Sequence, residues 1–303
     1  MRRSVEAPST GATSAAVSQV LVGTCTGVSA ALTAYPVGTG QALRYGLAGV
    51  AMYALLKLRT RGGDRPRIRV RPREWALLFL LALTGQTLFN QLLLGALDHA
   101  DPATVGSILG CAPVVLATVG ALPAGRQPGR RIVAASLLVV AGAVAVEGFG
   151  SATPTGLALA LGVLVCELAF SLLAVPLLPR LGPLRVAAYS TLLAVPQSLA
   201  IGWLSDGEAM VRMPTVAEAA ALVFLGLIAT VVAFLLWYSA LGRLGPERAG
   251  LFSGLVPIAA ALSALVLGTG TVHPEQVAGS ALVGLGVALG MFAPRRSWQA
   301  VRT

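Results

Sequence analysis

Long apolar stretches recur along the whole of this 303-residue chain, and they limit what it can fold into. Many reach the roughly 20 residues that an α-helix needs to cross the hydrocarbon core of a bilayer. Of all residues, 56% are hydrophobic and only 11% are charged, with a mean hydropathy of +0.80. That charge is too little to cover the surface of a soluble protein of this length. The chain is therefore expected to be an integral membrane protein.

The stretches lack the residue-by-residue alternation of a membrane β-barrel strand, so they predict an all-α fold. Turn-forming sequences separate them, including ADPA at 100–103 and RLGP at both 180–183 and 243–246. The first stretch is expected to be a retained span, because no small-residue cleavage site ends it. We expect ten transmembrane helices, at 13–34, 37–58, 74–97, 102–123, 132–148, 155–178, 184–204, 217–241, 249–268 and 275–293.

The formal net charge of +10 matches a membrane topology better than a nucleic-acid site. If the N-terminus lies in the cytoplasm and ten spans alternate, all but two of the 22 Lys and Arg residues fall on the cytoplasmic side. The exceptions are Arg44, inside a span, and Arg212, on the outside. Lys and Arg retained in the cytoplasm orient helical membrane proteins. Both termini are thus expected in the cytoplasm, with membrane lipid around the chain and no nucleic-acid partner.

The chain also contains an internal repeat. The segments GALDHADPATVGSILGCAPVV at 95–115 and SALGRLGPERAGLFSGLVPIA at 239–259 align without a gap. The constant offset of 144 residues pairs Pro102 with Pro246, Pro113 with Pro257, Gly106 with Gly250, Gly110 with Gly254, Gly142 with Gly286, and Glu74 with Glu218. A fixed period of this kind indicates a repeat architecture.

The repeat divides the chain into two five-helix halves, 1–150 and 151–303. Because five is odd, the second half crosses the membrane in the opposite sense. The charges agree, since the DHAD loop at 98–101 is acidic while its mate at 242–248, GRLGPER, is basic. Inverted repeats are typical of secondary transporters, which bind substrate between the halves near the midplane.

The segment ALDHADPATVGSILGCAPVV and its mate ALGRLGPERAGLFSGLVPIAAALSALVLG resemble the EamA-type transporters of the drug/metabolite transporter superfamily. In both, a small-residue AL ends one helix, and a short turn leads into a helix with a proline in mid-span. Arg44, in QALRYGLAGVAMYALL, also matches an arginine that this family commonly places early in its second helix.

The resemblance covers essentially the whole chain. It implies a permease of a bacterial-type inner (plasma) membrane, often an exporter of amino acids, other metabolites or drugs and frequently proton-coupled. A small-molecule substrate and protons are the partners to expect on this basis, and a homodimer is left open. At the middle of the sixth helix, where the family often has an aromatic residue, this chain has Glu167.

Glu167 and Arg44 are the charges that lie clearly within expected spans. A charge at the centre of a bilayer costs roughly 2.5–3.5 kcal/mol on insertion scales, so such residues usually face the bundle interior and mark function. One interpretation makes Glu167 a proton-coupling carboxylate and Arg44 an anchor for a substrate anion. The other pairs the two charges, or hydrogen-bonds them to neighbouring helices, for packing alone.

Polar side chains in other spans complete the candidate site. In GQTLFNQLLL, Gln86 and Asn90 are four residues apart and share a helix face, with Gln91 adjacent. They either line the substrate path or join helices, as amide side chains often do in membranes. Ser171 is a further candidate. Pro113 and Pro257 are expected to kink their helices and act as hinges rather than ligands.

Other functions have less support. No nucleophile–base pair, metal-ligand spacing or phosphate-binding glycine motif is present, and Cys25, Cys111 and Cys166 show no CxxC spacing. We therefore expect no enzyme and no cofactor. A sugar-phosphate or nucleotide-sugar antiporter would require several basic residues in the cavity. A non-transporting receptor or assembly subunit remains a third alternative.

Overall fold

A computed structural model describes residues 8–60, 68–120, 129–148, 150–266 and 273–292. Within this part of the chain the backbone is helical apart from turns and one isolated bridge between Ala100 and Ala152. The helices are α1 (Pro8–Ser29), α2 (Val37–Thr60), α3 (Pro72–Ala82), α4 (Phe89–Leu97), α5 (Pro102–Leu109), α6 (Ala112–Val119), α7 (Arg130–Glu147), α8 (Pro154–Ala174), α9 (Leu178–Asp206), α10 (Val216–Phe224), α11 (Ala233–Leu244), α12 (Pro246–Ala249), α13 (Leu255–Val266) and α14 (Pro274–Met291).

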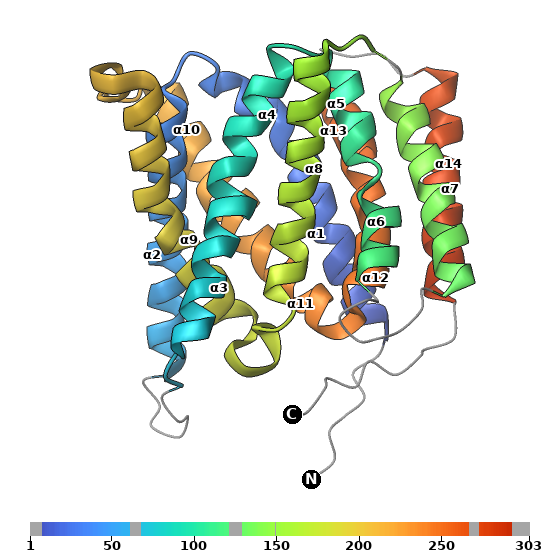
Figure 1. Cartoon of the computed structure of the whole chain (residues 1–303), viewed down its shortest axis with the longest axis horizontal. Helices are drawn as coiled ribbons and strands as arrows, with labels where there is room; N and C mark the ends of the chain where they lie inside the picture. The colour runs from blue at the N-terminus through green and yellow to red at the C-terminus, as the bar shows by residue number, and fades with distance from the viewer. Residues whose placement is uncertain (1–7, 61–67, 121–128, 149, 267–272, 293–303) are drawn as a thin grey trace.

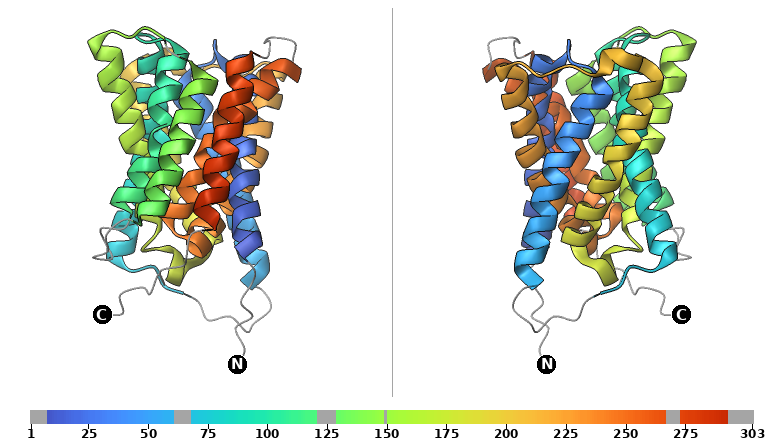
Figure 2. Two further views of the ribbon diagram at one scale, coloured as in Figure 1. Left: turned by 90° about the vertical axis from the view of Figure 1, so that its right-hand side faces the viewer. Right: turned by 90° about the vertical axis from the view of Figure 1, so that its left-hand side faces the viewer.

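Several of these helices join end to end through π- or 3₁₀-helical turns into longer runs. Among the described residues, six runs are long and apolar enough to cross a membrane: Pro72–Leu97, Pro102–Val119, Pro154–Ala174, Leu178–Ser205, Val216–Leu244 and Pro246–Val266. The runs lie lengthwise in one bundle, as Figures 1 and 2 show from three sides. The expected helix ends at 123, 268 and 293 and both chain termini lie outside the described residues.

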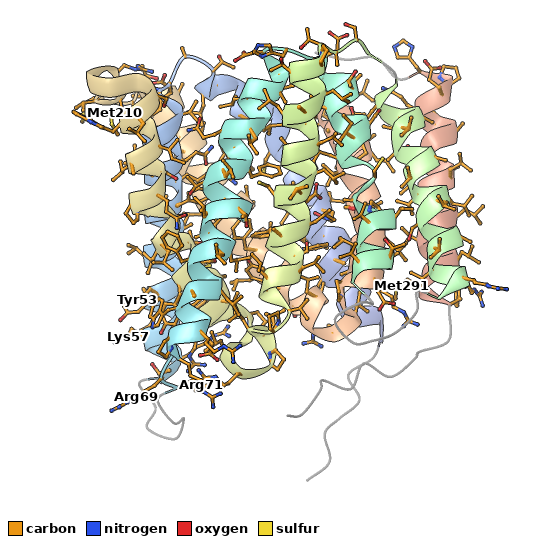
Figure 3. All side chains as sticks on the ribbon, viewed as in Figure 1. Tyr53, Lys57, Arg69, Arg71, Met210 and Met291 are labelled. Carbon is orange, nitrogen blue, oxygen red and sulfur yellow. The ribbon has the colours of Figure 1, made fainter. Side chains whose placement is uncertain are left out.

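One end of the bundle carries most of the positive charge. Figure 3 places Lys57, Arg69 and Arg71 at this end and Met210 at the other. We call the first end the basic face. The end of α2, the starts of α3, α7 and α9, the end of α11 and the short α12 lie there (Figure 1), and they carry or adjoin Lys57, Arg59, Arg69, Arg71, Arg73, Arg130, Arg131, Arg180, Arg185, Arg243 and Arg248. Arg212 lies at the opposite face, beside the turn that leads into α10. The charge asymmetry seen in the sequence is therefore also an asymmetry in space.

The sixth expected helix is shorter than predicted. It ends at Ala174 rather than at residue 178, and the turn at 175–177 is followed by a helical turn that starts at Leu178. The RLGP break then falls at Gly182, with φ 74° and ψ 164°. Gly245, in the second RLGP, has nearly the same backbone, with φ 76° and ψ 164°. Positive φ is strained for residues with a Cβ, and the residue before a proline avoids the helical region, so each Gly-Pro pair redirects the chain.

The packing follows the inverted repeat. α2 packs against α9, and α7 packs against α14, so the segments expected as the second and fifth helices of each half contact their counterparts in the other half. α1 packs against α11 and α13, while α8 packs against α4 and α5 in the same relation. The third span of each half contains a π-helix, at Leu83–Leu88 and Leu225–Val232. An offset of 144 residues places the first segment within the second, at 227–232, so the repeat extends to local backbone geometry.

Glycines let the two halves approach closely along α2 and α9. A Cβ added at Gly202 would lie 2.8 Å from the Cα of Gly38. This atom belongs to the backbone, so a side-chain rotation cannot relieve the clash. Gly202→Ala is therefore expected to destabilise the protein by about 1–3 kcal/mol. Gly46→Ala, on α2, is the control, because nothing lies within 4 Å of a Cβ added at that position. Melting temperatures of the detergent-solubilised chain check this, and equal values for the two variants would contradict it.

Candidate functional site

Glu167 lies on the face of α8 that is turned into the bundle. The other residues of this face, at helical spacing, are Ala160, Val163, Leu164, Ser171 and Ala174, and all of them are buried. Glu167 is half-buried, so it retains accessible surface among buried neighbours. No described residue makes a hydrogen bond or ion pair with its carboxylate. Because α8 ends at Ala174, Glu167 lies nearer the basic face than the sequence suggested, about 10 Å from the end of the helix at 1.5 Å per residue.

Aromatic rings pack beside Glu167 toward the basic face. Phe170, one turn further along α8, has its ring centroid 5.0 Å from that of Phe234 and 5.2 Å from that of Tyr238. Tyr238 is fully buried. Tilted aromatic pairs at these separations add to the stability of the apolar core. This cluster fills the interior between the Glu167 level and the basic face.

Arg44 reaches across the interface between the two halves. Its Nε donates a hydrogen bond of 2.8 Å to Oγ1 of Thr230, and its guanidinium lies 5.5 Å from the ring centroid of Tyr45. Thr230 in turn donates to the carbonyl of Leu225, five residues back in the π-helix. The π-helix thus presents the Thr230 hydroxyl to Arg44. Among the described residues Arg44 forms no ion pair with a carboxylate, so the proposed Glu167–Arg44 pair is not formed in this structure.

The amides of the third span gather around Tyr45 of α2. Asn90 donates to the Tyr45 hydroxyl at 3.0 Å and to the carbonyl of Gln86 at 2.5 Å, and it accepts from Gln41 at 3.2 Å. Gln86 is completely buried, yet neither its amide nitrogen nor its amide oxygen has a hydrogen-bond partner among the described residues. The amide oxygen of Gln41 also has none. Buried polar atoms are nearly always hydrogen-bonded, so these atoms are free to receive a ligand or water.

The remaining predicted residues lie at different places. Gln91 is half-buried, and the structure gives its side chain no hydrogen bond. Pro113 follows an interruption at 110–111 between α5 and α6, and Pro257 follows the 3₁₀ segment Gly250–Gly254. Proline cannot donate to the carbonyl four residues back, which accounts for the irregular backbone before each. The two interruptions occupy similar places in the two halves.

Two features were missed by the sequence analysis. Glu147, the last residue of α7, is half-buried against Gly106 of α5, and no described residue hydrogen-bonds to it. The run VAVEGFG did contain this carboxylate at the end of an apolar stretch, which was a usable signal. The two π-helices were also missed. Each contains one glycine, Gly85 or Gly226, but a single glycine inside an apolar run does not identify a π-helix, although such segments often occur at functional sites.

The loops at the opposite face are joined by Asp101. Its carboxylate accepts from the Ser151 amide at 2.6 Å and from the Ser151 hydroxyl at 2.9 Å, which joins the loop before α5 to the loop before α8. These hydrogen bonds lower the pKa of the Asp101 carboxyl below its usual range. A carboxyl with a lowered pKa stabilises the fold above its unfolded pKa, and this stabilisation is lost as the pH falls through the folded value.

Asp101→Ala is therefore expected to lower the melting temperature at pH 7. The difference from the parent should persist down to about pH 3.9, the unfolded pKa, and shrink progressively as the pH falls further toward the lower folded pKa. Thermal unfolding of the detergent-solubilised chain across pH 3–7 checks this. Asp98→Ala in the same loop is the control, since no described residue hydrogen-bonds to the Asp98 carboxylate. A difference that stays constant through the acid range would contradict the prediction.

One described cavity, of about 410 Å³, opens at the basic face beside the turn between α8 and α9. Its lining residues are Val175, Leu178, Pro179, Pro183, Ser239, Leu241, Gly242 and Arg243. None of the predicted site residues is among them. In the described part of the chain no group of His, Cys, Asp and Glu could hold a metal ion.

A helical bundle of apolar runs, built as an inverted repeat with polar and charged side chains at the interface of its halves, defines a membrane transport protein. The model of the EamA-like transporter family matches the chain twice, over residues 10–147 and 154–292. The chain therefore belongs to the EamA family of membrane transporters, within the drug/metabolite transporter superfamily. The resemblance seen in the sequence is confirmed.

Relatives agree with this assignment. The Bacillus subtilis (strain 168) protein named uncharacterized transporter YetK is 23% identical over 240 residues, which cover 77% of this chain and 72% of the relative. A probable terminal-alkyne amino-acid exporter from Streptantibioticus cattleyicolor is 28% identical over 267 residues, covering 84% and 86%. A crystal structure with 22% identity superposes with a TM-score of 0.81 over 96% of this chain, which supports the fold.

Proposed function

We propose that this chain is a secondary-active, proton-coupled exporter of a small organic metabolite, amino acid or drug. One observation carries the proposal: the Glu167 carboxylate faces the bundle interior, half-buried and without a partner among the described residues. A carboxylate in such a place is expensive unless it is protonated or bound to a ligand. Exchange of a proton for a substrate group at Glu167 would couple the two fluxes.

The substrate-binding region is proposed to lie between Glu167, Arg44 and the free amide atoms of Gln86 and Gln41. Arg44 uses Nε for Thr230, so its two Nη groups remain for a carboxylate or phosphate. A carboxylate on one side and a guanidinium on the other suit a zwitterion. The relative named as a probable terminal-alkyne amino-acid exporter makes amino acids the first class to test. Ser171 and Gln91 would line the same path.

The proposed topology has ten spans in two inverted halves, 1–150 and 151–303. The basic face would lie in the cytoplasm of a bacterial-type inner membrane, with both termini on that side. Its support is the concentration of Lys and Arg on one face, since positive residues are retained in the cytoplasm. The interruptions before Pro113 and Pro257 would be the hinges on which the fourth and ninth spans bend.

The test is transport by the full chain in proteoliposomes with an imposed pH gradient. Amino acids, other metabolites and antibiotics are added in turn, and substrate-dependent proton flux is recorded with an internal pH dye. Flux with at least one substrate, absent from empty liposomes, supports the proposal. Exchange of sugar phosphates without proton flux would favour the antiporter alternative, and no flux with any compound would favour a receptor or assembly subunit.

A further inference from the structure

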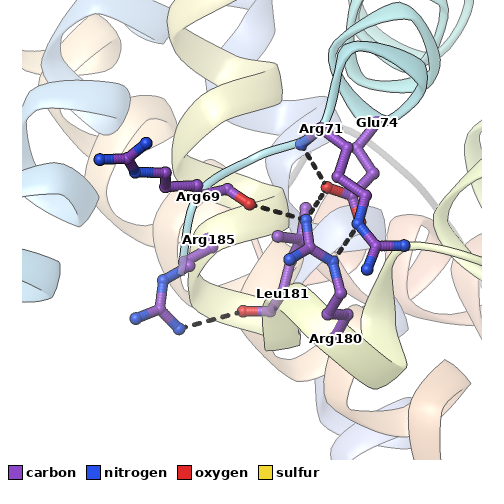
Figure 4. A network of polar contacts seen from close by, with 6 residues as sticks. All are labelled: Arg69, Arg71, Glu74, Arg180, Leu181 and Arg185. Atoms are coloured by element: carbon purple, nitrogen blue, oxygen red, sulfur yellow. Dashed lines mark hydrogen bonds and ion pairs between the residues drawn. The ribbon is translucent and has the colours of Figure 1, made fainter. Parts of the chain in front are cut away.

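Two ion pairs lie at the ends of the bundle, one at each face, and the repeat relates their two glutamates. At the basic face, Glu74 at the start of α3 is joined to Arg180, in the first turn of α9 (Figure 4). At the opposite face, Glu218 at the start of α10 is joined to Arg212. Glu74 and Glu218 are mates at the 144-residue offset. We call these pairs the basic-face tie and the opposite-face tie.

The basic-face tie joins the two halves of the chain. Nε of Arg180 donates to Oε1 of Glu74 at 2.5 Å, and Nη2 donates to the carbonyl of Arg69 at 2.8 Å. Glu74 is already fixed, because its Oε2 accepts from the Arg71 amide at 2.7 Å in a capping box. Arg180, from the second half, therefore binds a carboxylate of the first half that the capping box already orients. The Glu74 side chain is only 14% exposed.

At the opposite face, Arg212 of the second half contacts the first half. Arg212 donates to Oε1 of Glu218 at 2.5 Å and to the carbonyl of Ala34 at 3.3 Å, and its guanidinium lies 4.8 Å from the ring centroid of Tyr35. The Tyr35 hydroxyl also donates to the carbonyl of Arg212 at 2.8 Å. Glu218 is fixed by a capping box with Thr215. These contacts connect the turn before α2, in the first half, to the start of α10, in the second half.

The two ties lie at opposite faces and differ in construction. The Glu74–Arg180 ion pair itself crosses between the halves, whereas Arg212 and Glu218 both belong to the second half, and Arg212 reaches the first half through Ala34 and Tyr35. Each joins the start of the third span of one half to the turn between the first two spans of the other half. When two inverted halves rock about a central site, residues of opposite halves move apart at the face that opens and stay close together at the face that closes. Both ties are formed in this structure, so both ends are held in the same conformation.

We propose that the basic-face tie and the opposite-face tie are paired gates, and that each must break for the bundle to open at its own face. This rests on the proposed transport function only in assuming that the bundle opens alternately to the two faces. Weakening one tie removes stabilisation from the conformation in which that face is closed. The population then shifts toward opening at that face, in opposite directions for the two ties.

The test measures access to the interior from each side. The full chain carries Cys25→Ala, Cys111→Ala, Cys166→Ala and Ser171→Cys, which places one thiol a helical turn from Glu167. Right-side-out and inside-out membrane vesicles are treated with a charged, membrane-impermeant methanethiosulfonate. The sidedness ratio is the ratio of the two labelling rates, and it reports from which side the thiol is more accessible. Arg180→Gln and Arg212→Gln each remove the arginine contacts of one tie and leave both capping boxes intact. In Arg212→Gln the bond from the Tyr35 hydroxyl to the backbone carbonyl of residue 212 remains.

Arg180→Gln should shift the ratio at least about fivefold toward the basic face, and Arg212→Gln should shift it as far the other way; fivefold corresponds to about 1 kcal/mol at 1.4 kcal/mol per factor of ten. Arg180→Lys keeps the charge and should stay near the parent. Arg185→Gln is the matched control, since among the described residues Arg185 hydrogen-bonds to the Leu181 carbonyl alone. Asp98→Asn is the control at the opposite face.

The proposal that the ties are gates would be overturned by either of two results. The sidedness ratios of both variants could stay within about twofold of the parent, or they could move in the same direction. A fall in melting temperature without a change in sidedness would likewise make the ties purely structural. The labelling needs neither substrate nor a proton gradient, so its outcome is independent of the transport test. Transport with unchanged sidedness would reject the gates alone, and shifted sidedness without transport would reject the proposed function alone.

Discussion

Glu167→Gln is expected to abolish proton-driven accumulation of substrate. In proteoliposomes with a gradient of one pH unit, a carrier that exchanges one proton can accumulate substrate up to about tenfold, since one unit is worth about 1.4 kcal/mol. The glutamine keeps the size of the side chain and removes the titrating group. Accumulation should therefore fall to the level of empty liposomes, while substrate exchange without a gradient should continue.

Two variants sharpen this prediction. Glu167→Asp keeps a carboxyl group at the same place on α8 and should retain part of the accumulation. Glu275→Gln removes an exposed carboxylate at the start of α14, on the opposite face, and should behave as the parent. If Glu167→Gln accumulates substrate as fully as the parent and with the same pH dependence, Glu167 does not couple transport to protons.

Arg44→Gln is expected to weaken binding of an anionic or zwitterionic substrate by at least about 30-fold, because loss of a buried, hydrogen-bonded charge partner costs roughly 2–5 kcal/mol. The measurement is the half-saturating substrate concentration in counterflow, which needs no proton gradient. The loss should be confined to substrates with a carboxylate or phosphate group. Neutral compounds should be unaffected.

Thr230→Val is the matched control for Arg44. It removes the hydroxyl that receives the 2.8 Å hydrogen bond from Nε but leaves the guanidinium in place. If Arg44 anchors an anion, Thr230→Val should weaken binding far less than Arg44→Gln. If Arg44 only joins α2 to the second-half π-helix, the two variants should lose transport and melting temperature together, and the anchor would be rejected.

The contrast among the carboxylates supports a functional interpretation of Glu167. Glu74 and Glu218 each combine a capping box with an arginine, so their charges are compensated within the fold. Glu167 lies deeper and has neither. Its counterpart at the 144-residue offset is Gly23, so the shared scaffold of the two halves does not require a carboxylate there.

The sequence alone determined the helical membrane class, the approximate helix ranges, the repeat and the charge asymmetry. These are local properties, because an apolar run of fixed length and a proline or glycine at a fixed offset can be read without knowledge of any contact. It also selected Glu167 and Arg44, since charge within an apolar run is conspicuous wherever the run packs.

Only the tertiary structure decided how these charges are used. Arg44 and Thr230 are 186 residues apart, and a hydroxyl offered by an irregular π-helix cannot be foreseen from helical periodicity. Likewise, no local signal shows that Glu74 meets Arg180 across 106 residues while Glu167 meets no described partner. Such pairings depend on which helices the inverted packing brings together, and they distinguish the carboxylates that hold the fold from the one we propose to carry a proton.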